Sequence, residues 1–198
     1  IITVLFACLI GSSLLFYAGW ELIIVGLLCV LFAFLYTTGP YPLSYNGWGD
    51  ILVIVFFGFV PVGGTYYVQA LTWTTDTTIA SLICGLLIDT LLVVNNYRDR
   101  EADARSGKRT VIVRFGEKFG SYLYLMLGMT ASLLCFWFLF EGHLYAALLP
   151  LLYLIPHFLT WKRMVRIHSG KKLNSILGET SRNMLLMGIL LSIGFFLN

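Results

Sequence analysis

Seven long apolar runs, separated by short polar stretches, constrain the fold of this chain more than any other feature. A helix needs about 20 mostly apolar residues to cross a bilayer. Hydrophobic residues make up 59% of the 198 residues and charged residues only 12%, which excludes an ordinary soluble domain. We therefore predict one all-α domain over residues 1–198, a polytopic transmembrane helical bundle with spans near residues 1–18, 22–36, 51–71, 77–96, 121–140, 144–161 and 183–197.

All 13 lysine and arginine residues lie in two of the loops between these runs. One loop holds Arg98, Arg100, Arg105, Lys108, Arg109, Arg114 and Lys118, and the other holds Lys162, Arg163, Arg166, Lys171, Lys172 and Arg182. Because basic residues near span ends stay on the cytoplasmic side, both loops are predicted to be cytoplasmic. With seven spans, the loop over residues 37–50 falls on the same side.

The only dense cluster of charge, residues 95–110, begins where the fourth apolar run ends. On a helix, Asn95, Asp99 and Asp103 are spaced four residues apart and lie along one face. Such a face offers oxygen ligands to a hard cation, and Mg²⁺ is usually held by one or two carboxylates while substrate phosphates and waters complete its shell. The cluster therefore indicates a Mg²⁺ site that also takes a phosphorylated substrate.

Basic side chains lie within a few turns of these carboxylates. Arg98 and Arg109 can pair with phosphate oxygens through two parallel hydrogen bonds, and Lys108 can act as a point charge. The alternative is a solvated loop in which the carboxylates only balance neighbouring arginines. Repulsion between like charges one turn apart weighs against that alternative, as does the position of the cluster at the end of a membrane helix.

Two further features each leave two interpretations open. The loop from Tyr36 to Asp50 is rich in turn formers and aromatic rings, which suits either a cap over a cytoplasmic mouth or an interfacial aromatic belt. Asp89 lies inside the fourth run, where an ionisable group normally faces the protein interior. Asp89 either takes part in the functional site or makes a polar contact that only supports the structure.

Three separated stretches resemble the UbiA superfamily of intramembrane prenyltransferases. The stretch Asn95–Asp99 with Asp103, Ser106–Thr110 and Val113–Gly116 is similar to the second aspartate-rich motif of that superfamily. Residues 36–45 and 57–69 resemble the branch that prenylates 1,4-dihydroxy-2-naphthoate in menaquinone biosynthesis. The matches occur in the same order as in the superfamily.

This resemblance implies a Mg²⁺-dependent transferase with nine spans around a central cavity. Asp99 and Asp103 would be the catalytic, metal-binding carboxylates, with Asn95 or Asn96 assisting. Lys108 and Arg109 would contact the diphosphate, where the residues themselves also suggest Arg98. The implied reaction moves a polyprenyl group from polyprenyl diphosphate to an aromatic acceptor, here 1,4-dihydroxy-2-naphthoate, and gives demethylmenaquinol.

The resemblance also carries expectations about the whole protein. The superfamily's first aspartate-rich motif is missing, so we expect this chain to be a C-terminal portion with seven of nine spans and doubtful activity alone. We expect an integral protein of a bacterial cytoplasmic membrane that contacts lipid and no nucleic acid. The alternatives are another acceptor, such as 4-hydroxybenzoate or a tetrapyrrole, a transporter with carboxylates along an ion path, or an inactive fragment.

Overall fold

The computed structural model describes residues 2–197, and every regular element in that range is a helix. This confirms the predicted helical membrane bundle. The elements in chain order are α1 (Ile2–Ser12), α2 (Leu15–Ala18), α3 (Glu21–Thr37), η1 (Leu43–Asn46), α4 (Gly49–Val53), η2 (Ile54–Gly63), α5 (Gly64–Ala70), α6 (Thr75–Arg105), α7 (Val111–Leu134), α8 (Trp137–Phe140), α9 (Leu144–Leu148), η3 (Leu149–Tyr153), α10 (Leu154–Ile167), η4 (Lys171–Leu173) and α11 (Asn174–Phe196).

Helices occupy all seven predicted ranges, but they differ in length. Within residues 2–197, five continuous helical segments are long and apolar enough to cross a membrane: Gly49–Ala70, Thr75–Arg105, Val111–Phe140, Leu144–Ile167 and Lys171–Phe196. The first two predicted spans correspond to the shorter apolar helices α1 with α2, and α3. All seven predicted ranges are therefore helical, but within residues 2–197 only five of them lie in helical segments long enough to cross a membrane.

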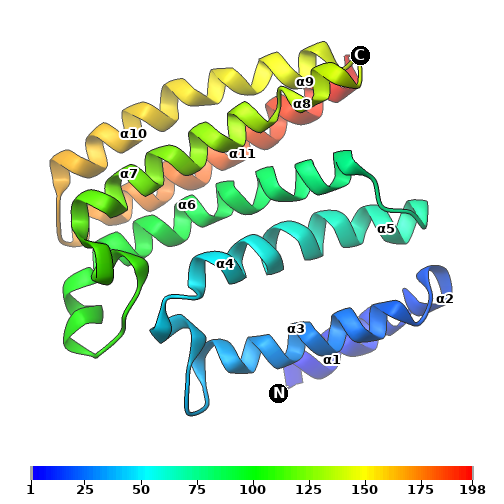
Figure 1. The fold of residues 1–198 in the computed structure, drawn as a ribbon, viewed down its shortest axis with the longest axis horizontal. Coiled ribbons are helices and arrows are strands. Elements are labelled where there is room, and N and C mark those ends of the chain that lie inside the picture. Colours follow the sequence, from blue (N-terminus) through cyan, green and yellow to red (C-terminus); the bar gives the residue numbers. More distant parts are fainter. Residues whose placement is uncertain (1, 198) are drawn as a thin grey trace.

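Helix α6 is the central element, with η2 packed on one side and α7 on the other (Figure 1). Its first turn is capped by Thr74, whose side-chain oxygen accepts a hydrogen bond from the Thr77 amide at 3.1 Å. The helix passes the predicted end of the span at Asn96 and continues to Arg105. It stops before Gly107, whose φ of +76° suits a residue without a Cβ. The charged cluster is therefore largely helical.

The segment that packs against α6 is a ten-residue π-helix, η2, which contains Pro61. Two glycines allow the backbones to approach closely. A Cβ on Gly58 would lie 2.5 Å from the Ser81 carbonyl oxygen, and a Cβ on Gly85 would lie 2.9 Å from the Ile54 Cα. Close backbone contact through small residues is a common way to pack helices in membranes. It holds the start of α6 next to the α4–η2 segment.

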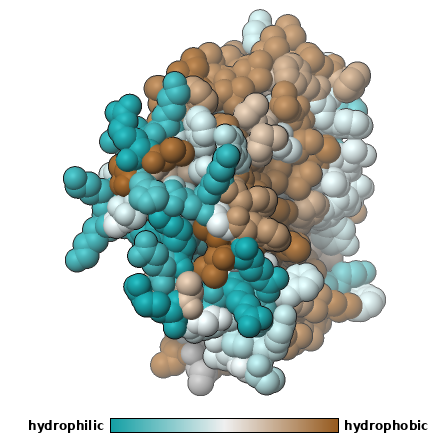
Figure 2. All heavy atoms as spheres, turned by 60° about the vertical axis from the view of Figure 1, so that its left-hand side comes forward, coloured by the Kyte–Doolittle hydropathy of each residue, from teal (hydrophilic) through white to brown (hydrophobic). Residues whose placement is uncertain are grey.

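Polar and apolar side chains are segregated at the level of the whole molecule. Figure 2 shows hydrophilic residues gathered at one end, where α6, the loop to α7 and the α10–α11 turn meet, with apolar residues over the top and much of the middle of that view. Helices α1 and α3 are strongly apolar, yet neither helix buries any residue inside the protein. An apolar exterior of this kind is suited to lipid.

Candidate active site

A cavity of about 330 Å³ opens at the polar end of the bundle. Two parts of the chain that are far apart in sequence form its wall: the loop from α3 to α4, and the end of α6 with the turn that follows. The lining residues are Tyr36, Thr37, Ser44, Tyr45, Gly47, Gly49, Asp50, Leu92, Asn95, Asn96, Asp103, Ser106, Lys108 and Thr110. Its volume is in the range of small-molecule sites.

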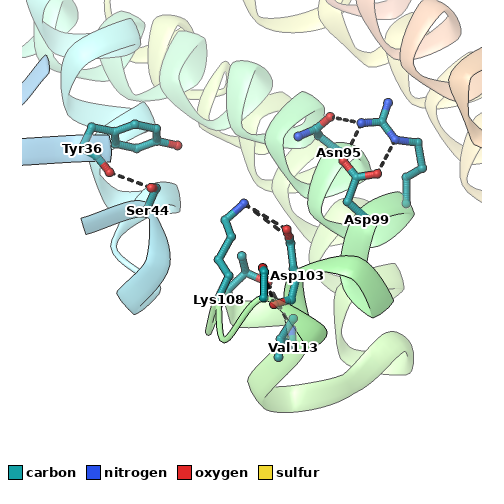
Figure 3. Close-up of polar contacts among 10 residues, drawn as sticks. Tyr36, Ser44, Asn95, Asp99, Asp103, Lys108 and Val113 are labelled. Carbon is teal, nitrogen blue, oxygen red and sulfur yellow. Dashed lines mark hydrogen bonds and ion pairs between the residues drawn. The ribbon is translucent and has the colours of Figure 1, made fainter. Parts of the chain in front are cut away.

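Four of the predicted site residues line this cavity: Asn95, Asn96, Asp103 and Lys108. The Lys108 Nζ atom lies 3.4 Å from both carboxylate oxygens of Asp103 (Figure 3). Both side chains are mostly buried, with 22% and 13% of their surfaces exposed. A partly buried lysine next to a carboxylate gives the cavity one cationic and one anionic group at the same place.

Asp99 is not among the lining residues, and its carboxylate is bound by Arg98 instead. The Arg98 Nε and Nη2 atoms donate to the two Asp99 oxygens at 2.7 and 2.6 Å (Figure 3). The same guanidinium donates to the side-chain oxygens of Asn95 at 2.7 Å and Asn174 at 2.9 Å. Its planar fork fits a carboxylate through two parallel hydrogen bonds. The predicted line of three oxygen ligands is therefore divided between the cavity and Arg98.

Backbone contacts hold the aromatic loop against the α6–α7 turn. The Arg109 amide donates to the Tyr45 carbonyl at 2.7 Å, and the Arg114 Nη2 atom donates to the Asn46 carbonyl at 2.7 Å. Within the loop, the Ser44 hydroxyl donates to the Tyr36 carbonyl at 2.6 Å (Figure 3). Of the two interpretations of this loop, the structure favours a cover over the mouth. Arg109 contributes its backbone to this contact.

Two acidic residues belong to this region that the charged cluster did not include. Asp50, at the start of α4, lines the cavity. Asp89, on α6, is 1% exposed, and its Oδ1 atom has no hydrogen-bond partner among residues 2–197. The two carboxylates interact electrostatically with each other and with the Tyr36 hydroxyl. The sequence indicated Asp89 because it is an acidic residue inside an apolar run. Asp50 gave no such signal, because an acidic residue is common in the first turn of a helix.

Sequence comparison now decides the family. The UbiA prenyltransferase family matches residues 1–195. The chain belongs to this family. A 1,4-dihydroxy-2-naphthoate octaprenyltransferase of Haemophilus influenzae is 34% identical over 195 residues, which cover 94% of this chain and 59% of that protein. The protein of the same name from Escherichia coli is also 34% identical, over 67% of its length.

A third UbiA-family relative, the 1,4-dihydroxy-2-naphthoate octaprenyltransferase of Mycobacterium tuberculosis, is 43% identical over 119 residues. That match covers 60% of this chain and 40% of the relative. The chain thus spans about 59 to 67% of the length of the two Haemophilus and Escherichia relatives. No solved structure matches it. These matches confirm the resemblance found in the aspartate-rich and aromatic stretches.

The side chains on the wall of this UbiA-family cavity fit a hard divalent cation. Asp103 supplies carboxylate oxygens, and Asn95 and Asn96 supply amide oxygens. Within residues 2–197, no three His, Cys, Asp or Glu side chains converge on one point. A cation bound here would therefore take phosphate oxygens and waters for the rest of its shell, as Mg²⁺ does in nucleotide sites.

Proposed function

We propose that the protein transfers a polyprenyl group from polyprenyl diphosphate to 1,4-dihydroxy-2-naphthoate, giving demethylmenaquinol. One observation carries this proposal: the cavity at the polar end of an apolar bundle brings Asp103, Lys108 and two asparagines together. The family and the activities by which its relatives are named agree with that chemistry. We propose that the cavity lies on the cytoplasmic side of the membrane, because it opens at the end of the bundle that carries the basic loops.

The proposed role of the acidic and amide groups is to hold Mg²⁺ together with the donor's diphosphate. Asp103, Asn95 and Asn96 already face the cavity, and Asp99 would join them when Arg98 turns to the phosphates. When bound, the ion would neutralise charge that develops on the departing diphosphate. The cavity walls keep most bulk water away from these side chains, which strengthens their electrostatic effect.

Cationic side chains are proposed to bind the diphosphate oxygens. Lys108 lies 3.4 Å from Asp103 and is oriented toward the cavity (Figure 3), so its ammonium group can stay between a phosphate and that carboxylate. Arg98 would offer two parallel hydrogen bonds to phosphate oxygens. Arg109 follows Lys108 in the turn after α6 and would contact the same group. These residues prepare the site for a leaving group with several negative charges.

An apolar groove of about 670 Å³ between η2, α5 and α6 has the surface that an isoprenoid tail requires. It is lined by Phe57, Pro61, Val62, Thr65, Tyr66, Gln69, Cys84 and Ile88. Because the groove lies on helices that can cross a membrane, a hydrocarbon chain would be held there by van der Waals packing and not by transfer out of water. We propose that part of the polyprenyl chain packs along this groove.

The test uses membranes that contain the full-length protein. They are supplied with polyprenyl diphosphate, Mg²⁺ and labelled 1,4-dihydroxy-2-naphthoate, with 4-hydroxybenzoate in a parallel reaction. We expect a prenylated naphthoquinol and released diphosphate in the first reaction. Asp103→Asn should reduce transfer at least 100-fold, whereas Glu101→Gln, on the same helix, should not. Transfer only to 4-hydroxybenzoate, or no transfer at all, would contradict the proposed substrate.

A further inference from the structure

Asp50 and Asp89 form an acidic pair that the diphosphate site does not use. Asp50 is at the start of α4 and lines the cavity, and Asp89 lies on α6 with only 1% of its surface exposed. Their charges act on each other and on the Tyr36 hydroxyl, so three polar groups from three elements share one region. Tyr36 also lines the cavity, and its ring projects toward it (Figure 3).

Neither carboxylate of this pair forms an ion pair with any of the residues that the structure describes. Within residues 2–197, the ion pairs join Arg98 to Asp99, Lys108 to Asp103, Arg163 to Glu179, and both Arg100 and His168 to Glu117, and none includes Asp50 or Asp89. The Oδ1 atom of Asp89 is buried without a hydrogen-bond donor. Buried polar atoms in folded proteins are nearly always paired, and an exception is costly unless a ligand or a proton completes it. Asp89 therefore needs a proton or a hydrogen-bond donor at its Oδ1 atom.

We propose that Asp50 is the catalytic base for the aromatic acceptor, with Asp89 and Tyr36 as the residues that position it. This inference rests on the proposed function, because only that reaction brings a phenolic acceptor into the cavity. Asp103 and Lys108 come from the end of α6 and the turn after it, whereas Asp50 and Tyr36 come from α4 and α3. The hydroxyl next to the acceptor's carboxylate would face Asp50, because only that hydroxyl is ortho to the ring carbon from which the carboxylate leaves.

The proton transfer balances without any further reactant. The acceptor's O–H bond breaks, the proton goes to the Asp50 carboxylate, and the electron pair stays on oxygen and makes the ring more nucleophilic. The ring carbon that bears the carboxylate forms the bond to the prenyl group, while the donor's C–O bond breaks and its electron pair leaves with diphosphate. The carboxylate then leaves as carbon dioxide, its electron pair stays with the ring, and Asp50 returns the proton to the oxygen.

Asp50→Asn in the full-length protein tests this role, because it removes the base and keeps the shape of the side chain. We expect transfer to 1,4-dihydroxy-2-naphthoate to fall on the order of 100-fold or more, as is typical when a general base is lost. The Kd for polyprenyl diphosphate should stay within about twofold, since the diphosphate residues are unchanged. Acceptors with electron-withdrawing substituents, whose hydroxyl groups are more acidic, should regain more rate in this variant than in the wild type.

Asp50→Glu is the matched control, because it keeps a base in the cavity. It should retain a measurable part of the rate, and Asp89→Asn and Tyr36→Phe should lower the rate without removing it. Wild-type transfer by Asp50→Asn, or a loss that is the same for every acceptor, would overturn the role of Asp50 and leave the proposed function standing. A wild-type protein that prenylates no phenolic acceptor would defeat the proposed function itself, and this inference with it.

Discussion

At the scale of single residues, the site is controlled by competition between cations and the same carboxylates. Arg98 holds both oxygens of Asp99, and Lys108 lies 3.4 Å from Asp103. Ion pairs that are partly exposed contribute little to stability, typically below about 1 kcal/mol. Their arrangement therefore matters more for what the carboxylates can bind than for whether the bundle folds.

Asp99→Ala should separate these two effects. We expect Mg²⁺-dependent prenyl transfer by the full-length protein to be abolished, because one proposed metal ligand is removed. The free energy of unfolding should change by less than about 1 kcal/mol, since the carboxylate is 39% exposed and pairs with one arginine. Product formation and thermal unfolding in detergent are the measurements. Wild-type turnover in this variant would contradict the metal assignment.

Lys108→Ala should weaken the binding of the prenyl donor and leave the binding of the aromatic acceptor unchanged. A hydrogen bond to a charged group contributes about 1.5–3 kcal/mol, so the Kd for polyprenyl diphosphate should rise at least about tenfold. Lys118→Ala is the matched control, because Lys118 is exposed and does not line the cavity. Donor binding can be measured by titration calorimetry in detergent. An equal effect of the two variants would show that only overall charge matters.

The sequence allowed part of this site to be predicted. Asn95, Asp99 and Asp103 share a helical face, and the spacing of the three residues made that visible. The spacing could not show that Arg98 would bind the Asp99 carboxylate outside the cavity, because the direction of each side chain depends on its rotamer. Asp50 was missed for a different reason: it is separated from the cluster by more than two helices, and no periodicity connects residues across such a distance.

At the scale of elements, α6 is positioned by close packing on one side and by polar contacts on the other. Gly58 and Gly85 bring η2 against it. On the far side, Glu117 of α7 accepts hydrogen bonds from Tyr97 at 2.7 Å and from Arg100 at 3.0 Å. Both contacts involve the helix that carries the proposed ligands, so each can be tested through stability and activity together.

Gly58→Ala should destabilise the bundle. Its Cβ would lie 2.5 Å from a backbone oxygen, and backbone cannot move aside as a flexible side chain can. Overpacking of this kind typically costs about 1–3 kcal/mol. Gly64→Ala is the control, because Gly64 has helical φ and ψ angles and nothing lies within 4 Å of its added Cβ. A lower Tm in detergent for Gly58→Ala alone is the expected result.

Glu117→Gln should loosen the charged end of α6. The carboxylate also pairs with His168 of the α10–α11 turn, so the substitution weakens links among three parts of the chain. Because Glu117 is about one-third exposed, the expected loss is about 1 kcal/mol, less than for a fully buried pair. The Tm should fall, and the difference from wild type should shrink at high salt. An unchanged Tm at low salt would argue against this contact as a support for the helix.

At the scale of the whole molecule, composition and hydropathy sufficed to predict a helical membrane bundle, but not the lengths of its helices. The fourth membrane span was predicted to end at Asn96, yet the helix continues to Arg105. Local hydropathy falls at the membrane surface, whereas a helix ends where capping allows, here before Gly107. Where a span leaves the bilayer and where its helix stops are different physical events.

Orientation is the remaining whole-molecule prediction, and it follows from charge asymmetry. Lys171 lies in the basic turn between α10 and α11, and Glu141 lies in the turn between α8 and α9. One cysteine is placed at either position, Lys171→Cys or Glu141→Cys, after Cys8, Cys29, Cys84 and Cys135 are replaced by alanine. Because basic residues are retained in the cytoplasm, a membrane-impermeant maleimide should label the first only in inside-out vesicles and the second only in right-side-out vesicles. If one vesicle type labels both, the two turns lie on the same side, and the arrangement that places the cavity on the cytoplasmic face is wrong.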